Sequence, residues 1–277
     1  MYKEDSILVQ NSKISYYEFG TGNEVILMVS GFGTPYPLLD MYNLAQKLSM
    51  HYRCIIIDRP GYGKSQITSS KRDAISFASE VTCILIKLGI DSKNVIMLGH
   101  SLGAIYSLVL SQRLNLKGIA LLDFEMLNKF ESLQTKFMYG IYFGMCQTKL
   151  REKYNKKLID KMIYSVKDVP TKIKNQAISF IENSMPNRNI KSELDSIDDD
   201  LYIIKHGMKV RKQKAIMFCT DKNKKANENL KKYYSESRLI TIDTNNHFVH
   251  YDNGDMIANK IIDFFEVKKD VWWNSKI

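Results

Sequence analysis

The sequence is poor in cysteine and tryptophan and has no long apolar run. Its 277 residues include four cysteines and two tryptophans. The cysteines (Cys54, Cys83, Cys146 and Cys219) lie far apart, without a C-x-x-C pair or a histidine at metal-ligand spacing, which argues against a zinc site. No apolar stretch is long enough to cross a bilayer, and no charged-then-apolar leader opens the sequence. We therefore expect a cytoplasmic protein with reduced, buried thiols and no stable membrane insertion.

Acidic residues are also in short supply. Forty lysines and arginines against 30 aspartates and glutamates give a formal net charge of +10. Such an excess raises nucleic acid or an anionic membrane as a partner. The lysines are spread along the chain, however, and neither zinc-finger spacing nor an aromatic RNA-binding motif accompanies them. We expect no nucleic-acid partner, and oligomeric state is not predicted.

Buried apolar runs alternate with helical patterns in two separate parts of the chain. This alternation predicts an α/β fold with a mostly parallel central sheet and helices on both faces. Between residues 124 and 209 only helical patterns occur. We therefore predict a core formed by residues 1–123 and 210–277, with residues 124–209 inserted as an all-helical cap. The expected core strands are Val25–Val29, Cys54–Ile57, Val95–Leu98, Gly118–Leu122, Ala215–Cys219 and Leu239–Ile242.

One segment resembles a phosphate-binding loop without matching it. Gly63-Lys64-Ser65 follows a strand, but the G-x-x-x-x-G-K-S pattern needs a first glycine where this chain has Asp58. Pro60 also removes a backbone N–H that would bind phosphate. We expect a structural turn here, and neither a nucleotide nor any other cofactor or metal.

The most informative motif is Gly99-His100-Ser101-Leu102-Gly103. It lies between an apolar strand and a helical pattern, as a G-x-S-x-G nucleophile elbow does. The two glycines would relieve clashes at the sharp turn and expose the Ser101 hydroxyl at the strand end. Ser101 is therefore the candidate nucleophile, and the side chain of His100 should point away from it.

A serine nucleophile needs a base and an acid. Among five histidines, His247 follows the last predicted strand, so it should share the carboxyl edge of the sheet with Ser101. Asp221, which follows the strand ending at Cys219, is the favoured acid. Asp123 and Glu125, after the preceding strand, remain alternatives at this stage.

Backbone N–H groups are needed to stabilise an oxyanion. Leu102 opens the elbow helix, and Phe32 lies in the loop after the Val25–Val29 strand, so both residues are candidates for the oxyanion hole.

Taken in chain order, these blocks resemble the capped form of the α/β-hydrolase superfamily. The resemblance covers about residues 7–123 and 210–268 and depends on five blocks, although Phe218 stands where a glycine often precedes the acid. It implies Ser101, Asp221 and His247 as a catalytic triad, with the N–H groups of Phe32 and Leu102 as the oxyanion hole. The blocks are Ser30-Gly31-Phe32-Gly33, Asp58-Arg59-Pro60-Gly61-Tyr62-Gly63-Lys64-Ser65, Gly99–Gly103, Asp221 and His247-Phe248-Val249-His250.

The resemblance implies a serine hydrolase of the carboxylesterase type that acts on a small acyl substrate. Members that open epoxides or haloalkanes use aspartate where this chain has Ser101. Thioesterase activity, carbon–carbon bond hydrolysis and ligand binding with little turnover remain alternatives. An apolar stripe on the insertion predicts a hydrophobic acyl pocket, and Trp272 and Trp273 are expected to dock on the core. The stripe comprises Phe130, Leu133, Phe137, Met138, Ile141, Tyr142 and Met145.

Overall fold

The computed structural model describes residues 2–127, 129–148 and 150–266, so Trp272 and Trp273 lie outside the described residues. Its central sheet has the strand order β1-β2-β4-β3-β5-β6-β7-β8. The six strands from β4 to β8 in this order are parallel, whereas β1 and β2 form an antiparallel hairpin at one edge. The strands are β1 (Tyr2–Val9), β2 (Ser12–Phe19), β3 (Val25–Val29), β4 (Arg53–Ile57), β5 (Val95–His100), β6 (Gly118–Leu122), β7 (Arg211–Cys219) and β8 (Tyr234–Thr241).

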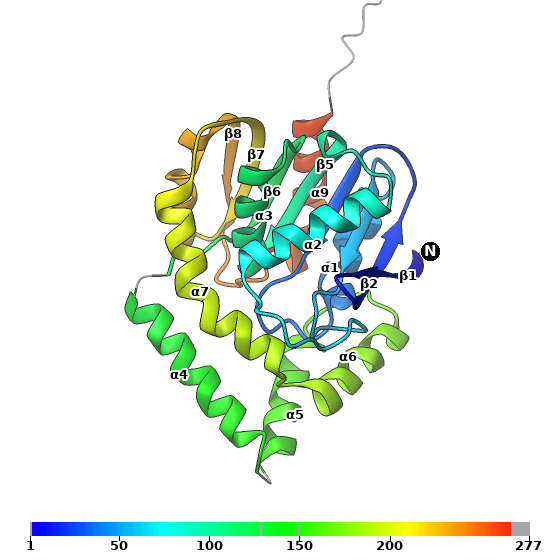
Figure 1. The fold of residues 1–277 in the computed structure, drawn as a ribbon, viewed down its shortest axis with the longest axis vertical. Coiled ribbons are helices and arrows are strands. Elements are labelled where there is room, and N and C mark those ends of the chain that lie inside the picture. Colours follow the sequence, from blue (N-terminus) through cyan, green and yellow to red (C-terminus); the bar gives the residue numbers. More distant parts are fainter. Residues whose placement is uncertain (1, 128, 149, 267–277) are drawn as a thin grey trace, which may run out of the picture.

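Helices cover both faces of this sheet, as the apolar strands predict. Every residue of β3, β5 and β6 is buried. On one face lie α1 (Pro37–Leu48) and α9 (Val249–Phe265), and on the other α2 (Ala74–Lys87) and α3 (Leu102–Arg113) (Figure 1). The predicted α/β fold with its parallel sheet is thereby confirmed.

Between β6 and β7 the described chain contains helices and no strand. We call residues 129–207 the helical insertion, which lies at one end of the sheet (Figure 1). None of the described helices is both long and apolar enough to cross a membrane. The helices of the insertion are α4 (Lys129–Met145), α5 (Arg151–Met162), α6 (Thr171–Ser184) and α7 (Arg188–Gly207).

Several element boundaries differ from the sequence prediction. The charged pattern of residues 226–234 predicts one helix, but the structure has two short pieces, α8 (Lys224–Glu228) and η3 (Lys231–Tyr233). The apolar pattern predicts a last helix that begins at Asp255, but α9 begins at Val249. An apolar count misses this first turn because it contains the polar His250, which is buried and hydrogen-bonded to Asp40. β8 begins at Tyr234 and not at Leu239, because most of its residues are exposed or half-buried at the sheet edge and give a weak apolar signal.

Candidate active site

Ser101 occupies a one-residue turn between β5 and α3. Its φ of +53° lies in the left-handed region, which non-glycine residues adopt at a cost. A Cβ on Gly99 would lie 2.1 Å from the Gly103 carbonyl oxygen, and one on Gly103 would lie 2.3 Å from that of Val29. The Ser101 N–H donates to the Leu122 carbonyl oxygen over 3.0 Å. Both glycines are therefore required by close backbone approach, which leaves Ser101 at the end of its strand.

His247 lies in the loop after β8, and its side chain lines the same cavity as that of Ser101. Its Nδ1 is 2.6 Å from Oδ2 of Asp123. Because an ionised carboxylate only accepts hydrogen bonds, Nδ1 carries the proton. With the proton on Nδ1, the lone pair of Nε2 is the one that can accept a proton, as a general base must.

The expectation that Asp221 is the partner of His247 is wrong, because His247 pairs with Asp123. Asp221 is exposed and begins the short helix η2 (Asp221–Asn223). Glu125, the other alternative, pairs with Lys222. The strand ending at Cys219 instead supplies Thr220, whose N–H and hydroxyl donate to Oδ1 of Asp123 over 2.8 and 3.0 Å.

Asp123 is held as a charged, oriented carboxylate. Its side chain is almost fully buried, and its φ of +46° turns the residue at the end of β6. Burial by itself would raise the pKa of Asp123, but the hydrogen bonds from His247 and Thr220 outweigh it and lower that pKa. The carboxylate therefore stays ionised at neutral pH and can stabilise a positively charged His247.

Phe32 and Leu102 both line the cavity beside Ser101. Leu102 is the first residue of α3, so its N–H has no acceptor within the helix. The N–H of Phe32 takes no part in the backbone hydrogen bonds between described loop residues. The two N–H groups predicted for an oxyanion hole thus belong to residues of this cavity, one at the start of α3 and one in the loop after β3.

Buried Arg59 holds the loop that carries Phe32. Its guanidinium donates to the carbonyl oxygens of Ser30 over 2.7 Å and Gly31 over 3.1 Å. The same group forms a fork with Glu193 of α7, with N···O distances of 2.8 and 3.2 Å. The loop after β4, which we expected to be only a structural turn, therefore also links the loop of Phe32 to the helical insertion. We call the loop of residues 30–33 the oxyanion loop.

The cavity beside Ser101 is small and mostly apolar. Its volume is about 350 Å³. The helical insertion contributes to its lining through residues of α4, α5 and α7. The α4 residues are Thr135 and Tyr139, whereas Phe137 and Met138 of the predicted stripe are exposed. The side chain of Phe130 lies outside the described residues. The lining residues are Phe32, Ser101, Leu102, Ile105, Glu125, Leu127, Thr135, Tyr139, Leu158, Lys161, Met162, Ile197, His247 and Phe248.

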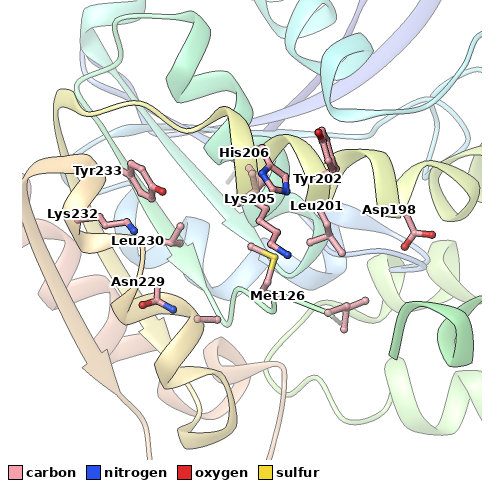
Figure 2. Close-up of a pocket in the computed structure, with 13 residues that line it drawn as sticks. Met126, Asp198, Leu201, Tyr202, Lys205, His206, Asn229, Leu230, Lys232 and Tyr233 are labelled. Atoms are coloured by element: carbon pink, nitrogen blue, oxygen red, sulfur yellow. The ribbon is translucent and has the colours of Figure 1, made fainter. Parts of the chain in front are cut away.

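A larger cavity, of about 800 Å³, lies between α7 and the segment of α8 and η3. Figure 2 shows Lys205 and His206 from α7 on one side and Leu230 and Lys232 on the other. Its described lining contains no serine or cysteine. The smaller cavity, by contrast, has both Ser101 and His247 in its lining, so it is the candidate active site.

A buried cluster behind the elbow was missed by sequence analysis. Asp40, His100 and His250 are each at most 3% exposed, and one possible ligand atom from each lies within 4.8 Å of the others. The three residues come from α1, β5 and α9, and only the packing of α1 and α9 on one sheet face joins them. One sequence-based expectation agrees with the cluster, namely that the side chain of His100 should point away from Ser101.

Comparisons with known proteins agree with this architecture. A family profile for the alpha/beta hydrolase fold matches residues 24–142. Over 105 residues the chain is 28% identical to the uncharacterized protein YbdG of Bacillus subtilis (strain 168), a match that covers 38% of this chain and 32% of YbdG. The chain thus matches only about a third of the length of this relative.

Two solved structures resemble the chain over nearly its whole length. Cfl2 from Burkholderia cenocepacia superposes with a TM-score of 0.77 at 16% identity, covering 96% of both chains. The epoxide hydrolase CorEH also gives a TM-score of 0.77, at 15% identity, covering 96% of this chain and 99% of CorEH. At such low identity these likenesses show the fold alone.

Proposed function

We propose that this chain is a serine hydrolase of the α/β-hydrolase superfamily that cleaves an ester or related acyl bond. The observation that carries the proposal is the pairing of His247 with Asp123 at a cavity that also contains Ser101. This set of nucleophile, base and acid fits transfer of an acyl group to water.

In the proposed reaction the Ser101 hydroxyl attacks the carbonyl carbon while His247 Nε2 takes its proton. Asp123 holds the imidazole in the required tautomer and stabilises the imidazolium. The N–H groups of Phe32 and Leu102 donate to the oxyanion. His247 then protonates the leaving group, and a water molecule that it activates hydrolyses the acyl-enzyme.

The serine nucleophile distinguishes this proposal from epoxide opening, the activity named for CorEH. A carboxylate that opens an epoxide forms an ester, which water can cleave in a second step. Ser101 would form an ether, which the same base and oxyanion donors could not hydrolyse. Acyl substrates are therefore the class that Ser101 can turn over.

Cavity size and lining support a small, apolar acyl group. A volume of about 350 Å³ is near the lower end of ligand pockets. Apolar side chains of α5 and α7, including Leu158 and Ile197, face the cavity together with those of the core. In this proposal the helical insertion acts as a cap that excludes water and selects the acyl chain.

A fluorophosphonate probe tests the nucleophile. We expect it to label the wild-type protein covalently at Ser101 and to leave Ser101→Ala unlabelled, because the probe phosphonylates only an activated serine. Intact-mass and peptide mass spectrometry measure both results, and Ser107→Ala, a buried serine of α3, serves as the matched control. An unlabelled wild type would favour the alternative, a ligand-binding protein on the same fold.

Substrate preference is tested with p-nitrophenyl esters of increasing acyl length. Each methylene that enters the apolar cavity contributes about 0.8 kcal/mol, so kcat/KM should rise by up to roughly fourfold per carbon from acetate to hexanoate. It should fall again for dodecanoate, which a cavity of about 350 Å³ does not hold. Equal kcat/KM for acetate and hexanoate would contradict an apolar acyl site.

A further inference from the structure

His100, the residue before the proposed nucleophile, contacts the proposed base directly. Its Nε2 lies 3.1 Å from the backbone carbonyl oxygen of His247. Burial lowers the pKa of His100 to about 3, so the ring is neutral at physiological pH. Because a carbonyl oxygen only accepts, Nε2 carries the proton and donates it. The hydrogen bond therefore fixes the tautomer of His100.

This contact gives His247 a second attachment. Its ring is held by Asp123, and its own backbone is held by His100. The two imidazole rings also pack, with centroids 4.9 Å apart. His100 and Ser101 are consecutive residues. The same turn therefore positions the proposed nucleophile and, through the hydrogen bond of His100, the loop that carries the proposed base.

Asp40 of α1 contacts both His250 and His100. Its Oδ1 accepts hydrogen bonds from His250 Nε2 and from the Tyr251 hydroxyl, each over 3.0 Å. His250 follows His247 by three residues, so these bonds attach the start of α9 to α1. Asp40 Oδ2 lies 3.9 Å from His100 Nδ1. The loop of His247 is thus held on one side by the elbow and on the other by α1.

We propose that His100 is a positioning residue for this site, acting through the His247 carbonyl, with Asp40 and His250 as its buried support. The inference rests on the proposed function, because it assigns His100 to the placement of the base. The side chain of His100 lines neither of the two cavities described above. A misplacement of about 1 Å at a reacting group can cost roughly a hundredfold in rate, which sets the scale of the expected effect.

The test removes the hydrogen bond while keeping the volume of the side chain. In His100→Phe and His100→Leu, kcat for hexanoate ester hydrolysis should fall ten- to a hundredfold with KM within about twofold. His100→Gln keeps an N–H donor that reaches the carbonyl and should recover most of the lost kcat. His206→Phe, in the larger cavity, is the matched histidine control and should behave as wild type. Thermal unfolding of every variant reports its folding separately.

The outcomes separate the two proposals. If the probe labels wild type and all His100 variants keep wild-type kcat, the positioning role is wrong and the hydrolase stands. If His100→Gln and His100→Phe lower kcat equally while both proteins stay folded, loss of the hydrogen bond is not the cause, and the inference is also overturned. If wild type is not labelled, the hydrolase fails, whereas ¹⁵N spectra of the histidine rings still test the Nε2 proton. A stoichiometric transition metal in purified protein would overturn the inference, because a metal in the cluster would use donor atoms of Asp40, His100 and His250.

Discussion

Replacing Asp123 by asparagine is expected to lower kcat by about 10⁴, whereas Asp221→Asn should retain activity close to wild type. Asp123 is the carboxylate that holds Nδ1–H of His247, and an asparagine can offer its N–H there and stabilise the wrong tautomer. Asp221 is exposed and forms no described hydrogen bond to His247. Steady-state hydrolysis of hexanoate esters measures both variants.

Thr220 offers a graded companion to this comparison. Thr220→Val removes the hydroxyl that donates to Asp123 but keeps the backbone donor. Its kcat should lie between wild type and Asp123→Asn, since the carboxylate then loses one hydrogen bond but keeps those from His247 and from the Thr220 N–H. Near-normal activity of Asp123→Asn, or loss of activity in Asp221→Asn, would reverse our assignment of the acid.

Breaking the buried pair of Arg59 and Glu193 should destabilise the fold strongly. Both side chains are fully buried, so Arg59→Met leaves the Glu193 carboxylate with only the Tyr62 hydroxyl as a described donor. Loss of one partner of a buried pair costs about 3–5 kcal/mol in the free energy of unfolding. Urea unfolding should show this loss as a lower midpoint.

The exposed pair of Lys191 and Asp195 on the same helix supplies the matched control. Lys191→Met should change the free energy of unfolding by less than about 0.5 kcal/mol, because both side chains are more than half exposed. The double variant Arg59→Met/Glu193→Leu should regain part of the stability by removing the unpaired charge. Its activity should stay low, because the carbonyl oxygens of Ser30 and Gly31 still lack their donor. A double variant with normal activity would show that Arg59 does not hold the oxyanion loop.

The local features of the chain were predictable because they depend on neighbouring residues. Strand β5 and the glycines around Ser101 both follow from short patterns. Ser101 and His247 could be singled out because parallel strands bring their carboxyl ends to one edge of the sheet. Element ends were less predictable where buried polar residues, such as His250, replace apolar ones.

The apolar stripe of α4 shows where periodicity misleads. Phe137 and Met138 share the predicted face, yet they are exposed, and Tyr139 reaches the cavity. A period identifies which residues share a side of a helix. It does not say which side the neighbouring helices and the core will cover.

The sequence by itself determined the parallel sheet, the elbow with Ser101 and the loop that carries His247, because local backbone sterics and apolar periodicity fix them. Only the tertiary structure decided between Asp123 and Asp221, since both follow parallel strands and only the fold of the loop after β8 selects one. The same holds for Arg59 with Glu193 and for Asp40 with His100 and His250. These contacts join residues that are far apart in the chain, and packing alone brings them together.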